Sequence, residues 1–164
     1  MRKIRILAAM SMDGFYIPLK ESQRLCNFDI SEYVEFCREA DAVLTSVTEY
    51  KKMREIELTH GKPVYMIKED TSLASEKETT GNNPLTIEEL QKSGKENILI
   101  TGNCRNLINS LLNKKRVDEI NTILFPVILG KGKRIFSALP LSLWKVKSRQ
   151  LSDLGITAIQ YNKK

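Results

Sequence analysis

Short apolar runs alternate with amphipathic segments along most of the chain. Runs of strand length and β-type composition occupy residues 4–10, 42–44, 63–67, 97–101 and 119–128. Apolar residues recur at helical spacing between them, over residues 31–40, 48–53, 86–93 and 107–112. Strands that alternate with helices form a largely parallel sheet with helices on both faces, so this order predicts an α/β fold.

Two further β-type runs, 143–151 and 156–161, are separated by Ser152-Asp153-Leu154-Gly155. This spacing predicts an antiparallel hairpin that closes one edge of the sheet. The polar segment 69–84 predicts a long surface loop, because too few strands lie on either side of it to form separate cores. We therefore expect residues 1–164 to form a single domain.

Local signals mark the ends of two helices. Thr86-Ile87-Glu88-Glu89 is a capping box, and Gly94 stands where a C-terminal glycine ends a helix. Ser31 is the predicted N-cap of the helix over 31–40.

Cysteine and histidine usage disfavours a disulfide framework and a metal site. The chain has three cysteines without CxxC spacing, and its single histidine, His60, lies in a predicted loop. The first apolar run is followed by no cleavage signal, and no run reaches the ~20 residues that span a bilayer. We expect a soluble cytoplasmic protein with no membrane contact and no bound metal.

Positive charge is concentrated in the last third of the chain. Residues 1–100 hold 14 basic and 17 acidic side chains, whereas residues 101–164 hold 12 basic and 3 acidic ones. The net charges are −3 and +9, which fits solvated strand faces, a site for an anionic small molecule, or a nucleic-acid surface. Aromatic residues are scarce among these charges, so no nucleic-acid partner is expected.

Four segments in a fixed order resemble one enzyme family. They are Ser11-Met12-Asp13-Gly14, the run 40–44 leading to Thr48, Val117-Asp118-Glu119-Ile120, and Pro126-Val127-Ile128-Leu129-Gly130 continuing to Phe136. Together they resemble the reductase family that includes dihydrofolate reductase and the reductase domain of riboflavin biosynthesis, and above all its small stand-alone members. The last string is the most specific of the four.

The resemblance implies a dihydrofolate reductase-like three-layer sandwich with a central mixed, mainly parallel sheet and an antiparallel C-terminal edge hairpin. It also implies a homodimer, and NADPH bound across the carboxyl ends of the strands beside a reducible heterocycle. Asp13 would lie at the substrate cleft as the catalytic carboxylate. The alternative is that Asp13 is a turn residue of the Asp-Gly pair.

The residues that the resemblance assigns to the cofactor are Thr48, Gly102, Asn103, Cys104 and Arg105. The chain departs from the family at three places: Thr45-Ser46 replaces Gly-Arg, Gly102-Asn103 replaces Gly-Gly, and Lys68-Glu69 replaces Ser-Arg. Arg105, Lys68 and the basic loop 131–134 offer replacement cations for a phosphate.

The leading hypothesis is an NADPH-dependent reductase of a pyrimidine- or pterin-like small molecule that can carry a phosphate. The competing hypothesis is a non-catalytic ligand-binding or assembly protein on a degenerate reductase scaffold. The zinc pattern of a deaminase partner domain, His-x-Glu with Pro-Cys-x-x-Cys, is absent. Folate is the less favoured substrate, because Trp144 is the only tryptophan and lies far from the first loop.

Overall fold

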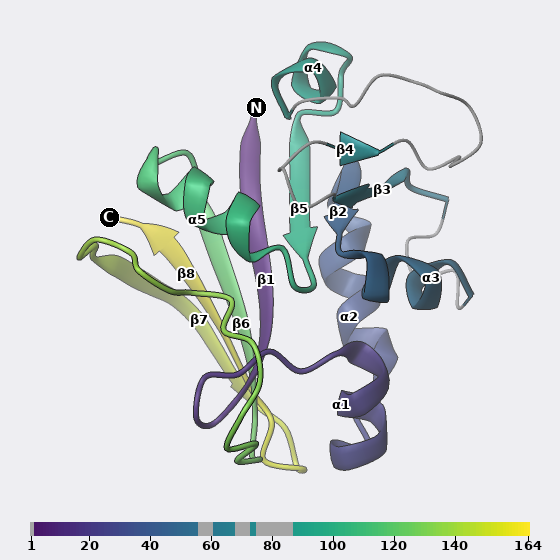
Figure 1. Ribbon diagram of the computed structural model, residues 1–164, viewed down its shortest axis with the longest axis vertical. Coiled ribbons are helices and arrows are strands. Elements are labelled where there is room, and N and C mark those ends of the chain that lie inside the picture. The colour runs from purple at the N-terminus through teal and green to yellow at the C-terminus, as the bar shows by residue number, and fades with distance from the viewer. Residues whose placement is uncertain (1, 56–60, 68–72, 75–86) are drawn as a thin grey trace.

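The computed structural model describes residues 2–55, 61–67, 73–74 and 87–164. The described strands form one eight-stranded sheet of order β4-β3-β2-β5-β1-β6-β8-β7 (Figure 1). Their bounds are β1 Lys3–Ser11, β2 Ala42–Thr45, β3 Val64–Ile67, β4 Leu73–Ala74, β5 Asn97–Thr101, β6 Glu119–Phe125, β7 Trp144–Leu151 and β8 Thr157–Lys163. The described helices are α1 Leu19–Cys26, α2 Ile30–Arg38, α3 Val47–Glu55, α4 Ile87–Lys92 and α5 Arg105–Asn113.

The sheet is mixed and mainly parallel, as expected. Strands β3, β2, β5, β1 and β6 run parallel, whereas β4, β8 and β7 pair antiparallel with their neighbours. The predicted C-terminal hairpin is confirmed, and β7 is the edge strand.

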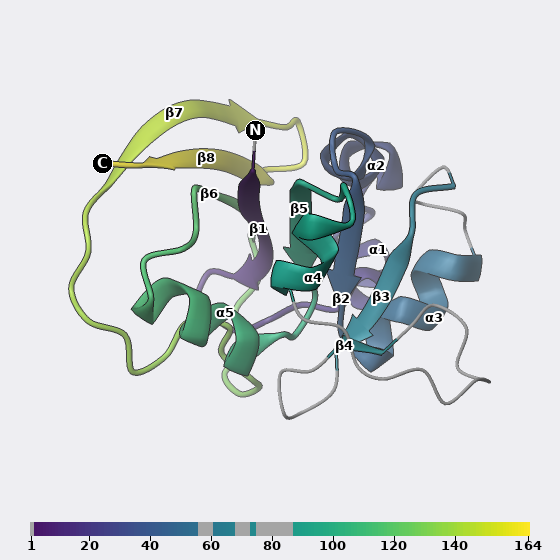
Figure 2. The same cartoon turned by 90° about the horizontal axis from the view of Figure 1, so that it is seen from above.

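Helices cover both faces of the sheet and produce three layers (Figure 2). Alternate residues of β1 divide the core, since Ile4, Ile6 and Ala8 pack with α4 and α5, while Leu7 packs with α1, α2 and α3. Near-continuous burial of β1, β2 and β5 is typical of parallel strands covered on both faces. Apolar burial on both faces therefore fixes the arrangement of the layers.

The chain order creates a crevice at the carboxyl ends of the central strands. The connection from β1 leads through α1 and α2 to β2, whereas the connection from β5 leads through α5 to β6 on the other side of β1. Ligands of open α/β sheets bind outside the carboxyl ends of the strands where the direction of winding changes. The starts of α3 and α5 lie at this edge (Figure 1).

Two local predictions need correction, and one helix was not predicted. The N-cap of α2 is Asp29, not Ser31, because the Asp29 carboxylate accepts the hydrogen bond from the Ser31 N–H and the helix begins at Ile30. Strand β6 ends at Phe125 instead of residue 128, since Pro126 has no N–H for a ladder bond. Helix α1 was not predicted, and its N-cap Pro18 makes no side-chain capping bond.

The end of α4 agrees with the prediction. Gly94 has φ +97°, the left-handed conformation that glycine adopts at helix ends, and the Lys95 N–H donates to the Leu90 carbonyl. Thr86, His60, Lys68 and Glu69 lie outside the described residues, as does most of the predicted loop 69–84.

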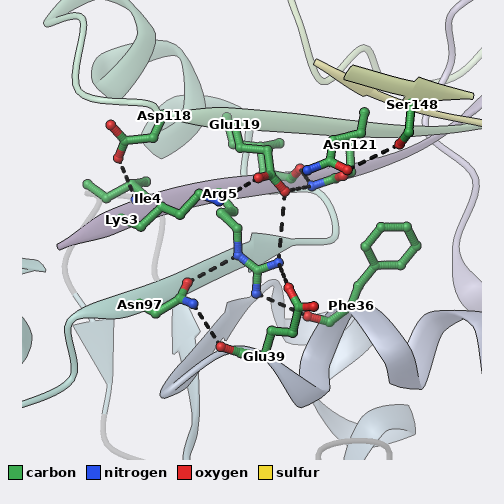
Figure 3. Close-up of polar contacts among 12 residues, drawn as sticks. Lys3, Ile4, Arg5, Phe36, Glu39, Asn97, Asp118, Glu119, Asn121 and Ser148 are labelled. Carbon is green, nitrogen blue, oxygen red and sulfur yellow. Dashed lines mark hydrogen bonds and ion pairs between the residues drawn. The ribbon is translucent and has the colours of Figure 1, made fainter. Parts of the chain in front are cut away.

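A buried charge network lies at the amino ends of β1, β5 and β6 (Figure 3). Arg5 is 2% exposed, and its guanidinium donates to Asn97 Oδ1 at 3.1 Å, to Glu39 Oε2 at 3.4 Å and to the Phe36 carbonyl at 3.2 Å. Glu119 Oε1 lies 3.9 Å from Arg5 Nη1. The network therefore joins α2 to the sheet at the end opposite the crevice.

Glu119 is the acidic centre of this network. Its carboxylate accepts hydrogen bonds from Lys3 Nζ at 2.6 Å and Asn121 Nδ2 at 2.9 Å. Burial raises the pKa of Glu119. Hydrogen bonds from Lys3, Asn121 and Gln160 lower this pKa by a larger amount in total, so the net pKa lies below its ordinary value. Glu119 is therefore ionised near neutral pH and accepts hydrogen bonds from Lys3 and Asn121.

Candidate functional site

A cavity of about 430 Å³ lies at the carboxyl ends of β2, β3 and β5. Four of the five residues predicted to bind a cofactor line it, namely Thr48, Asn103, Cys104 and Arg105. The rest of the lining is Ser46, Val47, Ile67, Asn106, Leu107 and Lys133. The fold thus brings together two chain segments that are more than fifty residues apart.

The first wall of the cavity is the start of α3. Thr48 is exposed, and its hydroxyl lies 3.3 Å from Ser46 Oγ. Ser46 Oγ also accepts the Asn103 N–H at 3.2 Å, which ties this wall to the loop after β5. Because Thr48 stands in the first helical turn, its hydroxyl and the free N–H groups of α3 are available to one anion.

Gly102, the fifth predicted residue, supports the cavity wall without lining it. Its φ is +78°, and a Cβ built there would lie 2.8 Å from both Thr45 Oγ1 and Ser46 Oγ. A side chain would therefore be strained and would clash with the end of β2. Glycine is needed here for the close approach of β5 to the start of α3.

The second wall is the start of α5. Cys104 is the N-cap and makes no side-chain capping bond, because its thiol donates to the Thr101 carbonyl at 3.2 Å. Burial raises the pKa of the Cys104 thiol, with a smaller contribution from Glu49, so the thiol is uncharged. The first turn of α5 contains no acidic residue and begins with Arg105. This wall suits an anion.

Asp13 joins the loop after β1 to the loop after β6. Its Oδ1 accepts from Ser11 Oγ at 2.5 Å and from the Leu129 N–H at 3.1 Å, and its Oδ2 accepts from the Gly130 N–H at 2.7 Å. The Ser11 hydrogen bond contributes most to lowering the pKa of Asp13 to about 2; the loop N–H groups also lower it, and burial opposes the shift. The carboxylate therefore clamps the loop after β1 to the loop after β6, and its contact with a substrate stays a prediction.

The basic loop 131–134 supplies one cation to the cavity, Lys133. Arg134 has another role: its Nη1 donates to the Asp13 carbonyl at 3.0 Å, and its guanidinium lies 4.3 Å from the centre of the Phe15 ring. The expectation that the whole loop offers free cations is therefore too broad, because Arg134 is engaged in holding the Asp13 loop.

Glu49 is a buried acid that the sequence analysis missed. It is 3% exposed, and its Oε1 accepts from Tyr16 Oη at 2.7 Å and from the Leu19 N–H at 3.0 Å. Burial raises the pKa of Glu49, and the two hydrogen bonds oppose the shift without cancelling it. The available signal was its i, i+4 spacing from Met53, which is also buried and places Glu49 on the inner face of α3.

Within the described part of the chain, no helix is long and apolar enough to cross a membrane. No group of three or more His, Cys, Asp and Glu side chains among the same residues is arranged to hold a metal ion.

Comparisons with known proteins find one matching family model and several solved structures of similar fold. The family model of the RibD C-terminal domain matches residues 82–159, which include β5, α5 and β6. No curated protein sequence matches the chain.

Solved structures share the fold over nearly the whole chain. A pyrimidine reductase-like protein from Corynebacterium diphtheriae has a TM-score of 0.70 at 11% identity, covering 98% of this chain and 91% of its own. The Thermotoga maritima diaminohydroxyphosphoribosylaminopyrimidine deaminase/5-amino-6-(5-phosphoribosylamino)uracil reductase has a TM-score of 0.66 at 14% identity. The match covers 99% of this chain and 57% of the Thermotoga maritima chain. Enterococcus faecalis dihydrofolate reductase complexed with NADP(H) has a TM-score of 0.64 at 10% identity, and the match covers 99% of this chain and 96% of the reductase chain. The expected dihydrofolate reductase-like fold and the resemblance to the reductase family are confirmed.

Proposed function

Because the chain matches the RibD C-terminal domain over residues 82–159 and has the dihydrofolate reductase-like fold, we propose that it is an NADPH-dependent reductase of a pyrimidine- or pterin-like small molecule. The observation that carries this proposal is the cavity at the carboxyl ends of β2 and β5. Two helices begin at this cavity, and Thr48, Asn103, Cys104 and Arg105 line it. Gly102 supports its wall.

The cavity residues fit the phosphate groups of a dinucleotide. The first turns of α3 and α5 supply N–H donors, Thr48 supplies a hydroxyl, and Arg105 and Lys133 supply positive charge. These groups replace the arginine that the chain lacks at Thr45-Ser46. NADPH, when bound, supplies the hydride for the reduction.

In this proposal the protein's own residues orient the two reactants. The Asp13 clamp fixes the loop that carries Lys133, and Arg134 packs on Phe15 beside it. We propose Asp13 at the edge of the substrate cleft, where its ionised carboxylate accepts hydrogen bonds from both loops. Asp13 would then act on the reaction by positioning, in addition to any direct contact with substrate.

Positive charge near the cavity favours a phosphorylated substrate. Arg105 and Lys133 line the cavity, whereas Lys145, Lys147 and Arg149 are exposed on the edge strand β7. A ribose phosphate, such as the Thermotoga maritima reductase named above acts on, would be attracted by the positive charge around the cavity, while Arg105 and Lys133 themselves contact the phosphates of the dinucleotide. The positive charge therefore supports a phosphorylated, riboflavin-type substrate over a folate in this proposal.

A non-catalytic ligand-binding or assembly protein is the second candidate. It is favoured by the Asp13 carboxylate, which already has three protein donors, and by the loss of the Gly-Arg pair at Thr45-Ser46. In that case the cavity would bind a small anion without turnover.

Calorimetric titration with NADPH and NADH, without substrate, tests the proposal. We expect heat from NADPH binding at micromolar concentrations. Absence of heat for both nucleotides up to millimolar concentration would overturn the reductase assignment. Nucleotide binding without oxidation of NADPH, when 5-amino-6-(5-phosphoribosylamino)uracil or dihydrofolate is added, would favour the second candidate.

We also propose a homodimer that uses the edge of the sheet formed by β7. Every β7 residue after Trp144 is exposed, and the apolar side chains of Val146 and Leu151 are 54% and 74% exposed. An edge strand with exposed apolar side chains suits association with a second copy.

A further inference from the structure

We propose that Glu49 determines which ligand charge the cavity accepts, so that an anionic group binds well only while the Glu49 carboxyl group is protonated. The inference rests on the nucleotide site proposed above. It concerns a residue that the family resemblance did not assign.

Glu49 lies immediately behind the cavity wall. Its Cγ is 3.1 Å from the point that a Cβ of Gly102 would occupy. The next residues along the chain, Asn103 and Cys104, line the cavity, and so do Ser46, Val47 and Thr48 just before Glu49 on the other segment. A charge on Glu49 would therefore act on a ligand in the cavity across one layer of residues.

The hydrogen bonds of Glu49 are divided unequally between its two oxygens. Oε1 accepts from Tyr16 and from the Leu19 N–H, while Oε2 is buried and has no hydrogen-bond partner among the described residues. Thr45 Oγ1, which also faces Gly102, is likewise buried without a partner there. An ionised Oε2 without a partner is costly in a buried site, and a proton on Oε2 removes that cost.

The groups that face Glu49 provide no compensating cation. They are the Tyr16 hydroxyl from the loop after β1, the Leu19 N–H at the start of α1, Tyr33 of α2 and the Cys104 thiol at the start of α5. Burial raises the pKa of Tyr16, Tyr33 and Cys104, so all three are uncharged near neutral pH. No ion pair joins Glu49 to a cation within the described residues.

Ionisation of Glu49 would place a negative charge beside a site for phosphates. At an effective dielectric constant of ~20, two unit charges several ångströms apart change an affinity by roughly ten- to a hundredfold. Arg105 and Lys133 would favour the anion at every pH, whereas Glu49 would oppose it only when deprotonated. Affinity for an anionic ligand should therefore fall as the pH rises through the raised pKa of Glu49.

The test is calorimetric titration with NADH and NADPH over pH 5 to 9, using the wild-type protein and Glu49→Gln. Glutamine keeps the oxygen that accepts from Tyr16 and Leu19 but cannot ionise. NADH is the main probe, because NADPH carries an additional phosphomonoester that itself titrates near pH ~6. We expect wild-type affinity for NADH to fall at least about fivefold across this range, and Glu49→Gln affinity to change less than twofold.

Two further variants separate this effect from general destabilisation. Glu119→Gln removes a buried acid at the opposite end of the sheet and should keep the wild-type pH profile. Tyr16→Phe removes a donor that favours the ionised carboxylate, so it should move the loss of affinity to higher pH. This shift remains measurable if Glu49→Gln does not fold.

Each outcome has a distinct meaning. Wild-type protein that binds neither nucleotide at any pH would overturn the proposed function and this inference with it. Binding with a flat pH profile, or with the same profile in wild type and Glu49→Gln, would overturn this inference alone. A Tyr16→Phe profile that does not move would also count against it.

Discussion

The Asp13 carboxylate accepts a 2.7 Å hydrogen bond from the Gly130 N–H, although 117 residues separate the two in the chain. The neighbouring Leu129 N–H donates to the same carboxylate. Gly130 has φ +75°, which allows two successive N–H groups to converge on one side chain. The Asp-Gly sequence after the first strand and the glycine-lysine loop thus form one structural unit beside the cavity.

We expect Asp13→Ala to loosen the loop after β6. Amide hydrogen exchange at Leu129 and Gly130 should accelerate, because both N–H groups lose their acceptor. The pKa of Asp13 is lowered to about 2, so its contribution to stability is complete above the ordinary value of 3.8 and is lost as the pH falls through about 2. The protection of these two amides, measured against the unstructured exchange rate at the same pH, should therefore fall in the wild-type protein as the pH falls through about 2, and the variant should respond less. Equal exchange in both proteins would contradict the clamp.

The same residue tests catalysis through Asp13→Asn. Asparagine keeps one carbonyl acceptor, so we expect folding and NADPH affinity to be retained while turnover is lost. Steady-state kinetics and calorimetry on the same preparation measure both quantities. Loss of folding, with no effect on turnover per folded molecule, would assign Asp13 a structural role alone.

Gly102→Ala should destabilise the protein more than Gly130→Ala. Both glycines have φ near +75°, but the added methyl group meets Thr45 and Ser46 at position 102 and meets nothing within 4 Å at position 130. Backbone strain alone costs about 1 kcal/mol, and the clash adds roughly 1–3 kcal/mol. Urea unfolding of the two variants gives the difference directly. Equal losses of stability would mean that β2 and α3 move apart easily.

Thr48→Val should weaken NADPH binding by roughly 1 kcal/mol or more, about a fivefold or larger rise in Kd, because a hydrogen bond to a charged phosphate is lost. Valine keeps the shape of the side chain. Thr122→Val on β6, outside the cavity, is the matched control and should bind NADPH normally. Unchanged affinity in Thr48→Val would place the phosphates elsewhere in the cavity.

The two acids that contact Arg5 should differ in their contribution to stability. Glu119 has a side chain that is 3% exposed, whereas that of Glu39 is 76% exposed. Glu119→Ala leaves a buried guanidinium without its buried partner and should cost ~3–5 kcal/mol, while Glu39→Ala should cost less than about 1 kcal/mol. The lowered pKa of Glu119 adds stability above its ordinary pKa of 4.5 that is lost on acidification. Chemical denaturation at pH 7 and pH 4 checks both points.

Replacing Val146 and Leu151 together by glutamate should convert the proposed dimer to a monomer. The two side chains are exposed on the edge strand, and buried charges would be costly at an interface. Light scattering after size exclusion reports the mass. Leu25→Glu on α1 is the control and should not change it. A wild-type protein that is already monomeric at high concentration would contradict the dimer.

Much of the fold was determined by the sequence itself. The apolar runs that became β1, β2, β5 and β6 are buried on one or both faces, and hydrophobic pattern is a property of the local sequence. Gly94 and the turn before β8 could also be predicted from the sequence, because backbone conformations with positive φ select glycine. Helix α1 could not be predicted, since its one strongly buried apolar residue, Leu19, produces no periodic signal.

The composition of the cavity depends on tertiary structure and does not follow from the local hydrophobic pattern. The sequence placed Thr48, Asn103, Cys104 and Arg105 in one site by resemblance, but only the pairing of β2 with β5 brings their segments together. The basic side chains that produce the net charge of +9 in residues 101–164 also lie in different parts of the folded protein. Lys133 reaches the cavity, Arg134 holds the Asp13 loop, and the cations of β7 face solvent.

Glu49 is the clearest example of a residue whose environment only the tertiary structure determines. In the sequence it is one acid in a polar helix, whereas in the tertiary structure it is buried between Tyr16, Leu19 and Gly102. Local pattern decides which residues turn inward, because burial of apolar surface follows the strand and helix periods. The protonation and partners of a buried acid depend on contacts between distant segments, and those exist only in the folded chain.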